Sequence, residues 1–182
     1  MRSTRILLSL IGAIFALTAA TATAQNGSGA TPPACSDANS GLPPALSGWA
    51  KAPVPMSTAH TVAEAARSPF PFGERVALKL AQTDSVAFAH QPGEQMPKQY
   101  IYSGMISVRV PKGGDYTVMI SEANWVDVVQ GGQLIAAKQM GPRIACAKYG
   151  KKLEFPLTSG DAIVQFFGAP YETVDVLVAP AP

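Results

Sequence analysis

Apolar side chains recur at every second position along most of the chain after residue 74, and this alternation limits the possible fold more than any other feature. Period two is the spacing of one face of a β-strand, and no helical pattern lies between the apolar runs. Gly, Pro and Asp separate the runs, and such short connections favour antiparallel pairing. The alternation predicts about nine strands, at residues 76–80, 86–88, 106–110, 116–120, 125–129, 134–135, 153–157, 162–167 and 174–178.

Two segments repeat one arrangement, in which Gly-Asp stands directly before an apolar strand. The turns at 111–115 and 158–161 therefore predict two related β-hairpins. Two such hairpins suit a two-sheet sandwich, so we predict an all-β, antiparallel, jelly-roll-like β-sandwich over residues 74–182. Its expected core consists of the alternating apolar positions that polar residues interrupt least: Val76, Leu78, Val108, Val110, Tyr116, Val118, Ile120, Phe155, Leu157, Val164, Val174 and Val176.

The N-terminus has the pattern of a secretory signal peptide. Arg2 and Arg5 precede an apolar run at 6–17, and Ala22-Thr23-Ala24 supplies a small-x-small cleavage site. The apolar run has about 12 residues, whereas a membrane-spanning helix needs ~20. We therefore predict a cleaved signal peptide over residues 1–24 and a periplasmic protein, associated with a membrane only through a partner.

Cys35 and Cys146 are the only cysteines of the chain. In an oxidising compartment an even pair predicts one disulfide, which would join the N-terminal part to the sandwich. A metal or redox role is disfavoured, because the two cysteines lie far apart, form no CxxC and have no neighbouring His.

The charge and the motifs exclude several classes of function. Of the 14 Lys and Arg, two lie in the predicted signal peptide, which leaves 14 − 2 = 12 against 12 Asp and Glu. A neutral chain lacks the basic surplus that nucleic acid requires. His60 and His90 are the only histidines, and the Cys-x-x-Cys-His of a c-type haem, the serine hydrolase elbow and the dinucleotide fingerprint are absent. We predict a non-catalytic protein without cofactor or metal, and rank a small secreted hydrolase last.

Residues 25–73 predict an irregular, Pro-rich arm. Prolines at 32, 33, 43, 44, 53 and 55 argue against any sheet strand within 25–56, whereas residues 57–67 are compatible with a short helix capped by Ser57 or Thr58. The arm also carries side chains of the kind that are usually buried. We predict that Leu42, Leu46 and above all Trp49 bind a partner, with the alternative that the arm completes its own domain.

The strand at 125–129 carries a second candidate surface. Alternation places Val126 and Val128 on one face and Trp125 and Asp127 on the other. If the valines face the core, Trp125 and Asp127 form an outward pair suited to a carbohydrate, with Tyr100 or Tyr102 as further contacts. The alternatives are that Trp125 lies in the core or is covered by the arm or a partner.

The chain resembles the smallest subunit of the membrane-bound quinohaemoprotein alcohol dehydrogenase of acetic acid bacteria. The resemblance rests on size, the export signal, the arm with Leu46-Ser-Gly-Trp49-Ala and the β-rich part with Asn124-Trp125-Val126-Asp127-Val128-Val129. It implies a periplasmic complex in which a large subunit carries pyrroloquinoline quinone and haem c, and another subunit carries several haems c. The smallest subunit then has no cofactor and supports assembly or stability. A secreted carbohydrate-binding jelly roll is the alternative.

Overall fold

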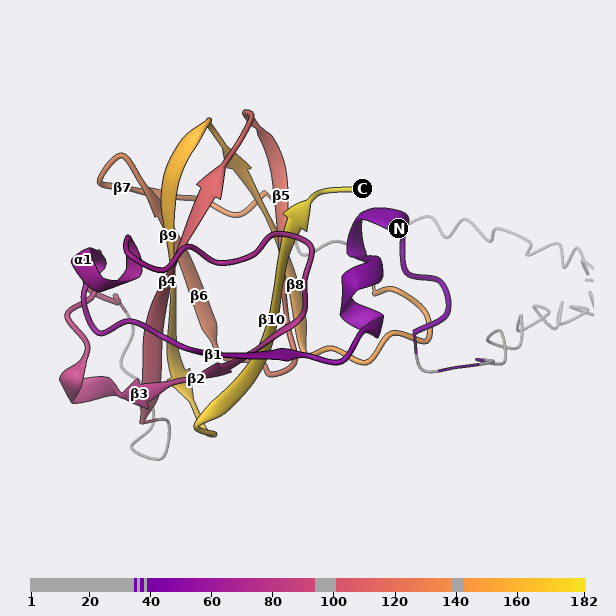
Figure 1. The fold of residues 1–182 in the computed structure, drawn as a ribbon, viewed down its shortest axis with the longest axis horizontal. Coiled ribbons are helices and arrows are strands. Elements are labelled where there is room, and N and C mark those ends of the chain that lie inside the picture. The colour runs from indigo at the N-terminus through magenta and orange to yellow at the C-terminus, as the bar shows by residue number, and fades with distance from the viewer. Residues whose placement is uncertain (1–34, 36, 38, 94–100, 139–142) are drawn as a thin grey trace, which may run out of the picture. The chain divides into compact units, whose positions relative to one another are not determined.

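The computed structural model describes residues 35, 37, 39–93, 101–138 and 143–182, and within them ten strands form two packed sheets (Figure 1). Sheet A has the order β1 (Val54–Ser57), β2 (Val76–Lys79), β10 (Thr173–Pro180), β5 (Gly114–Ile120) and β8 (Lys151–Leu157). Sheet B has the order β3 (Ala81–Gln82), β4 (Tyr102–Val110), β9 (Gly160–Ala169), β6 (Trp125–Gln130) and β7 (Gln133–Ile135). The predicted all-β sandwich is confirmed, whereas the predicted signal peptide lies outside the described residues.

The strand order is that of a jelly roll, because the run β2-β10-β5-β8 in sheet A is matched by the run β4-β9-β6-β7 in sheet B. Among these eight strands, the chain changes sheet at every connection except the one from β6 to β7. The prediction of two hairpins was wrong. β4 and β5 are consecutive in the chain but lie in different sheets, and so do β8 and β9. Each Gly-Asp turn therefore carries the chain across the sandwich, and the two crossings lie side by side, with β4 paired to β9 and β5 paired to β8.

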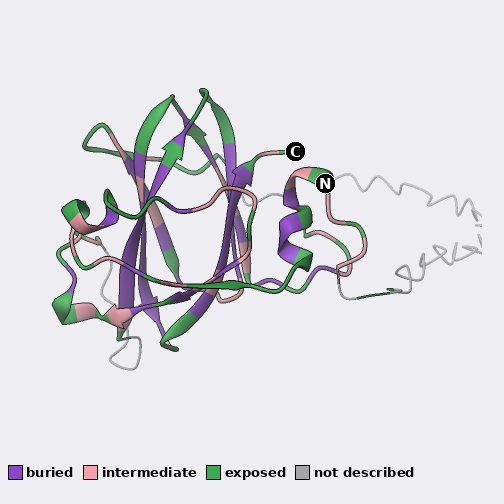
Figure 2. Cartoon of the chain, viewed as in Figure 1, coloured by how far each residue is buried: buried purple, intermediate pink, exposed green. Residues whose placement is uncertain are grey.

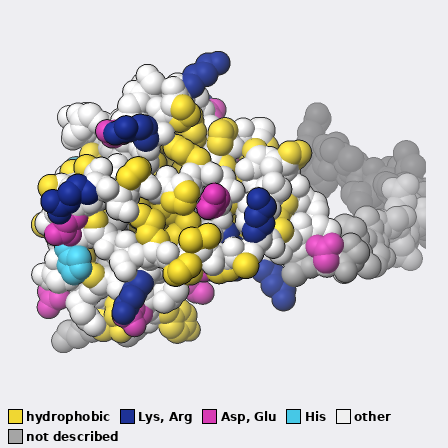
Figure 3. Space-filling view, viewed as in Figure 1, with side chains coloured by type: hydrophobic (Ala, Val, Ile, Leu, Met, Phe, Trp, Pro, Cys, Tyr) yellow, Lys and Arg dark blue, Asp and Glu magenta, His cyan; other side chains and the backbone are white. Residues whose placement is uncertain are grey.

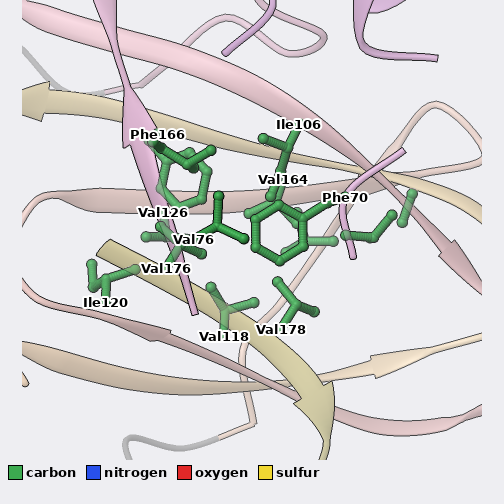
Figure 4. Close-up of a cluster of buried hydrophobic side chains, with 14 of the residues drawn as sticks. Phe70, Val76, Ile106, Val118, Ile120, Val126, Val164, Phe166, Val176 and Val178 are labelled. Atoms are coloured by element: carbon green, nitrogen blue, oxygen red, sulfur yellow. The ribbon is translucent and has the colours of Figure 1, made fainter. Parts of the chain in front are cut away.

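The main core lies between the sheets and contains all twelve predicted residues. Figure 4 shows its centre, where side chains of both sheets meet around Phe70 and Phe166. The alternation of apolar positions thus located the inner faces of β2, β4, β5, β8, β9 and β10 correctly. Phe70 comes from the segment between α1 (Val62–Ala65) and β2, whose backbone bonds to β4 at Ser107.

A second apolar cluster lies on the outer face of sheet A. The arm forms a 3-10 helix, η1 (Pro44–Ala50), which contacts β10 and buries Leu46 and Trp49 completely. Figure 2 shows this buried side of η1. The cluster consists of Leu46, Trp49, Met119, Ala147, Tyr149, Leu177 and Ala179, with Leu42 and Ile144 packed against it. A Cβ on Gly48 would lie 1.8 Å from the Gly73 carbonyl oxygen, so only glycine permits this approach.

The predicted disulfide is present between Cys35 and Cys146, whose Cα atoms lie 5.4 Å apart. It joins the start of the described arm to residues 143–150, the segment that contributes Ala147 and Tyr149 to the second cluster. Cys146 has φ 66°, a conformation that L-residues other than Asn and Asp adopt rarely. The disulfide therefore fixes both chain segments that cover the outer face of sheet A.

The expectation that residues 25–56 contain no strand is corrected by β1, which pairs in parallel with the edge of β2. The backbone N–H groups of Val54 and Thr58 donate to the carbonyl oxygens of Arg75, just before β2, and of Lys79, its last residue. Pro55 falls at an alternate position, where an N–H would point away from the sheet, so proline breaks no ladder bond. The predicted short helix is present as α1, but Thr61 rather than Ser57 or Thr58 caps it, accepting from Glu64 N–H at 3.2 Å.

Candidate functional site

The structure places the predicted partner anchors of the arm inside the chain's own core. Leu46 and Trp49 are 0% exposed, and Leu42 is partly buried against the same cluster. An anchor for a partner must present its side chain at the surface, which Leu46 and Trp49 do not. In this structure the arm completes its own domain, which was the alternative interpretation of its apolar residues.

Among the alternatives left open for Trp125, the structure has the outward orientation. Val126 and Val128 belong to the main core, while Trp125 is 41% exposed on the other face of β6. Its ring stacks on Phe167 of β9, with ring centroids 6.2 Å apart and planes inclined by 12°. The ammonium of Lys151, the first residue of β8, lies 5.3 Å from the ring centroid. These two neighbours reduce the ring surface on which a sugar could stack.

Asp127 shares the outer face of sheet B with a buried amide. Gln165 is 0% exposed, and its Nε2 donates to the Asp127 carboxylate at 3.4 Å. The His90 N–H donates to Gln165 Oε1 at 3.2 Å, and Gln165 Nε2 donates to the His90 carbonyl oxygen at 2.8 Å. The Gln165 amide thus holds the backbone at His90 against the sheet. Burial raises the pKa of Asp127, opposed by the Gln165 hydrogen bond and the nearby His90. The carboxylate is therefore already engaged within the chain.

A pocket of about 580 Å³ opens at the edge of the sandwich beside Trp125. Its walls come from β6, from β7 and the residues after it, and from β8, so it lies where sheet A and sheet B part. Val126, Ile135, Leu153 and Phe155 form its inner wall and belong to the main core or pack against it. Among the described residues that line it, the charged ones are Asp127 and Lys151.

Lys151 lies at this pocket without a carboxylate partner in the described part of the chain. Its ammonium donates to the Asn124 carbonyl oxygen at 3.1 Å. Burial of the group lowers its pKa, because desolvation disfavours the charged form. Sequence reasoning missed Lys151 as a site residue, because three lysines within 148–152 are typical of a solvated turn.

The tyrosines proposed as further sugar contacts do not join Trp125. Tyr102 lines a separate cleft of about 660 Å³ together with His60, Asp84 and Glu172, near the opposite edge of the sandwich. Tyr100 lies outside the described residues. His60 contacts the Ser85 carbonyl oxygen through Nδ1 at 3.2 Å.

A hydrophobic surface lies over β1 and over the segment between α1 and β2. It consists of residues 52–55, all exposed, and residues 69–72, of which Pro69 is exposed and Phe70 is buried; we call it the Pro-rich band. Val54, at 50% exposed, is among the most exposed large apolar side chains of the described residues. Figure 3 shows hydrophobic side chains gathered at the centre of this face. The band lies within the arm predicted over residues 25–73, but the partner anchors predicted there were Leu42, Leu46 and Trp49, none of which belongs to it.

The described residues contain no group of three or more His, Cys, Asp or Glu placed to hold a metal ion. In the same part of the chain, no helix has the length and apolar character needed to cross a membrane. The chain matches no protein-family model, no curated protein and no solved structure.

Proposed function

We propose that this chain is a non-catalytic accessory subunit of a periplasmic dehydrogenase that carries pyrroloquinoline quinone and haem c, and that it contacts the large subunit through the Pro-rich band. The observation that carries the proposal is the exposed apolar surface of residues 52–55 and Pro69, together with the partly exposed Pro71 and Phe72. Contiguous exposed apolar surface on a secreted protein marks a site of interaction. The disulfide is compatible with an oxidising compartment, and the resemblance noted above supplies the class of partner.

The backbone of the band favours side-chain packing over strand addition. β1 is an edge strand of sheet A, and Pro55 removes the N–H that an added strand would need. Prolines at 53, 55, 69 and 71 also fix the local φ angles, so little conformational entropy is lost when a partner binds. The band is therefore a preorganised apolar surface for a protein partner.

The substitution Val54→Glu tests the proposal. Val54 is half exposed and its side chain is not part of the main core, so we expect the variant to fold. A charge at the centre of an apolar contact should lower recovery of the haem-containing large subunit roughly tenfold in a pull-down from the native host. The measurement is haem absorbance in the eluate, relative to the amount of tagged chain.

Tyr171→Glu is the matched control, since Tyr171 is 62% exposed in the turn between β9 and β10 and lies outside the band. Recovery of the large subunit should be unchanged in this variant. The proposal fails if the wild-type chain recovers no haem protein, or if Val54→Glu recovers as much as Tyr171→Glu does.

The carbohydrate-binding alternative rests on the exposure of Trp125 beside Asp127. The contacts of Trp125 with Phe167 and Lys151 weigh against it, because sugar stacking requires open ring surface. Retention of the purified chain on a polysaccharide column, lost in Trp125→Ala, would favour this alternative over the accessory subunit.

A further inference from the structure

The pocket beside Trp125 has the features of a small-molecule site. Its volume, about 580 Å³, lies within the roughly 300–1,000 Å³ usual for ligand pockets, which are mostly apolar with a few placed polar groups. Apolar side chains from both sheets line its inner wall, so an apolar ligand would extend the main core rather than sit on a wet surface. The shape of the site therefore selects a ligand with an apolar body.

The positive charge of Lys151 at the pocket indicates which polar group the other end of that ligand should carry. Lys151 stands at the pocket as a half-buried ammonium, bonded to a neutral carbonyl oxygen and lying over the Trp125 ring. None of the ion pairs in the described part of the chain includes it. A partly desolvated cation gains most from an anion that hydrogen-bonds to it directly.

Asp127, the other charged residue at the pocket, does not neutralise Lys151. Its carboxylate accepts from Gln165, which lies on the outer face of sheet B, whereas Lys151 bonds to Asn124. The pocket thus presents one apolar wall and one available cationic group.

We propose that this pocket binds a single-chain amphiphile with a carboxylate head, such as a fatty acid. The acyl chain lies against Val126, Leu153 and Phe155, and the carboxylate pairs with the Lys151 ammonium. This inference is independent of the proposed accessory role, because the pocket and the Pro-rich band share no residue.

Trp125 provides a direct readout, because it lines the pocket while Trp49 is buried in the second cluster. The probe is 11-bromoundecanoate, whose bromine quenches nearby tryptophan, added below its micellar concentration to the disulfide-bonded mature protein. We expect saturable, partial quenching in the wild type and none in Trp125→Phe, in which Trp49 remains. The uncharged 11-bromoundecanol should bind roughly tenfold more weakly, the loss of one charge-assisted hydrogen bond.

Substitutions at Lys151 and Ala136 distinguish the contribution of the charged group from that of the apolar pocket. Lys151→Gln should weaken binding of the acid about tenfold and leave the alcohol unchanged, while Lys151→Arg should retain the preference for the acid. Ala136→Phe, at an exposed position of the pocket lining, should weaken both ligands by filling space. Absence of saturable quenching overturns the site. Equal affinity of the wild type for acid and alcohol overturns the assignment of the head group, even if Lys151→Gln does not fold.

Discussion

Trp49 joins the arm to the sandwich through contacts on every part of its side chain. Its indole N–H donates to the Lys148 carbonyl oxygen at 2.9 Å, so the one polar atom of a fully buried ring is satisfied. The guanidinium of Arg75 lies 4.8 Å from the ring centroid and also donates to the Trp49 carbonyl oxygen at 3.2 Å. Asp175 of β10 fixes Arg75 with a hydrogen bond of 3.0 Å. These bonds make Trp49 a core residue of its own domain.

The substitution Trp49→Ala should therefore destabilise the isolated protein by about 3–5 kcal/mol, the usual cost of removing a large buried aromatic side chain. Trp49→Phe should cost less, because it retains most of the apolar contact and loses the bond to Lys148. Urea denaturation followed by far-UV circular dichroism measures both values. An alanine variant within about 1 kcal/mol of the wild type would contradict the burial of Trp49.

At the scale of the elements, period-two alternation located β2 and β4 to β10, but it missed β1 and β3 and predicted a strand at 86–88 that is irregular in the structure. Val118 and Val176 were assigned to the core because their sequence neighbours were expected to face outward, and both lie there. The same argument put Trp125 and Asp127 on the face of β6 opposite to Val126 and Val128, without deciding which face is buried. Such inferences succeed because the two faces of a strand are fixed by local backbone geometry alone.

The partners of each strand could not be predicted in the same way. A turn such as 111–115 signals where a strand ends, but a hairpin and a crossing between sheets use the same Gly and Asp residues. β1 was missed because its prolines were taken to exclude a strand. Proline is excluded only from positions whose N–H would face a neighbouring strand, and whether Pro55 is such a position depends on the register of β1 with β2. The pocket at Lys151 brings together the edges of two sheets, which no local pattern specifies.

The disulfide should stabilise the arm without determining the strands. Cys35 and Cys146 are 111 residues apart, and a cross-link of that span is worth about 2–5 kcal/mol through its effect on the unfolded chain. The double variant Cys35→Ser, Cys146→Ser should lose stability within that range, measured by urea denaturation, and keep the far-UV spectrum of the wild type. Loss of β-structure in the folded variant would show instead that the cross-link is required for the sandwich to form.

At the scale of the whole molecule, the two apolar clusters are linked because they use opposite faces of the same strands. Val118 of β5 and Val178 of β10 point into the main core, while their neighbours Met119 and Leu177 point into the second cluster beneath the arm. Release of the arm would expose Met119 and Leu177 to water on the central strands of sheet A. Neither cluster can therefore be lost without weakening the surface on which the other is built.

We expect the arm and the sandwich to unfold in a single transition, with the disulfide intact or reduced. In Trp125→Phe the remaining Trp49 reports on the second cluster, while far-UV circular dichroism reports on the sheets as a whole. Reduction should shift both denaturation midpoints downward by the same amount, because the cross-link acts on the unfolded chain and leaves the contacts of η1 with β10 in place. Fluorescence that changes at lower urea than the circular dichroism would contradict this expectation. The arm would then be a separate unit of stability, held on sheet A chiefly by the bond between Cys35 and Cys146.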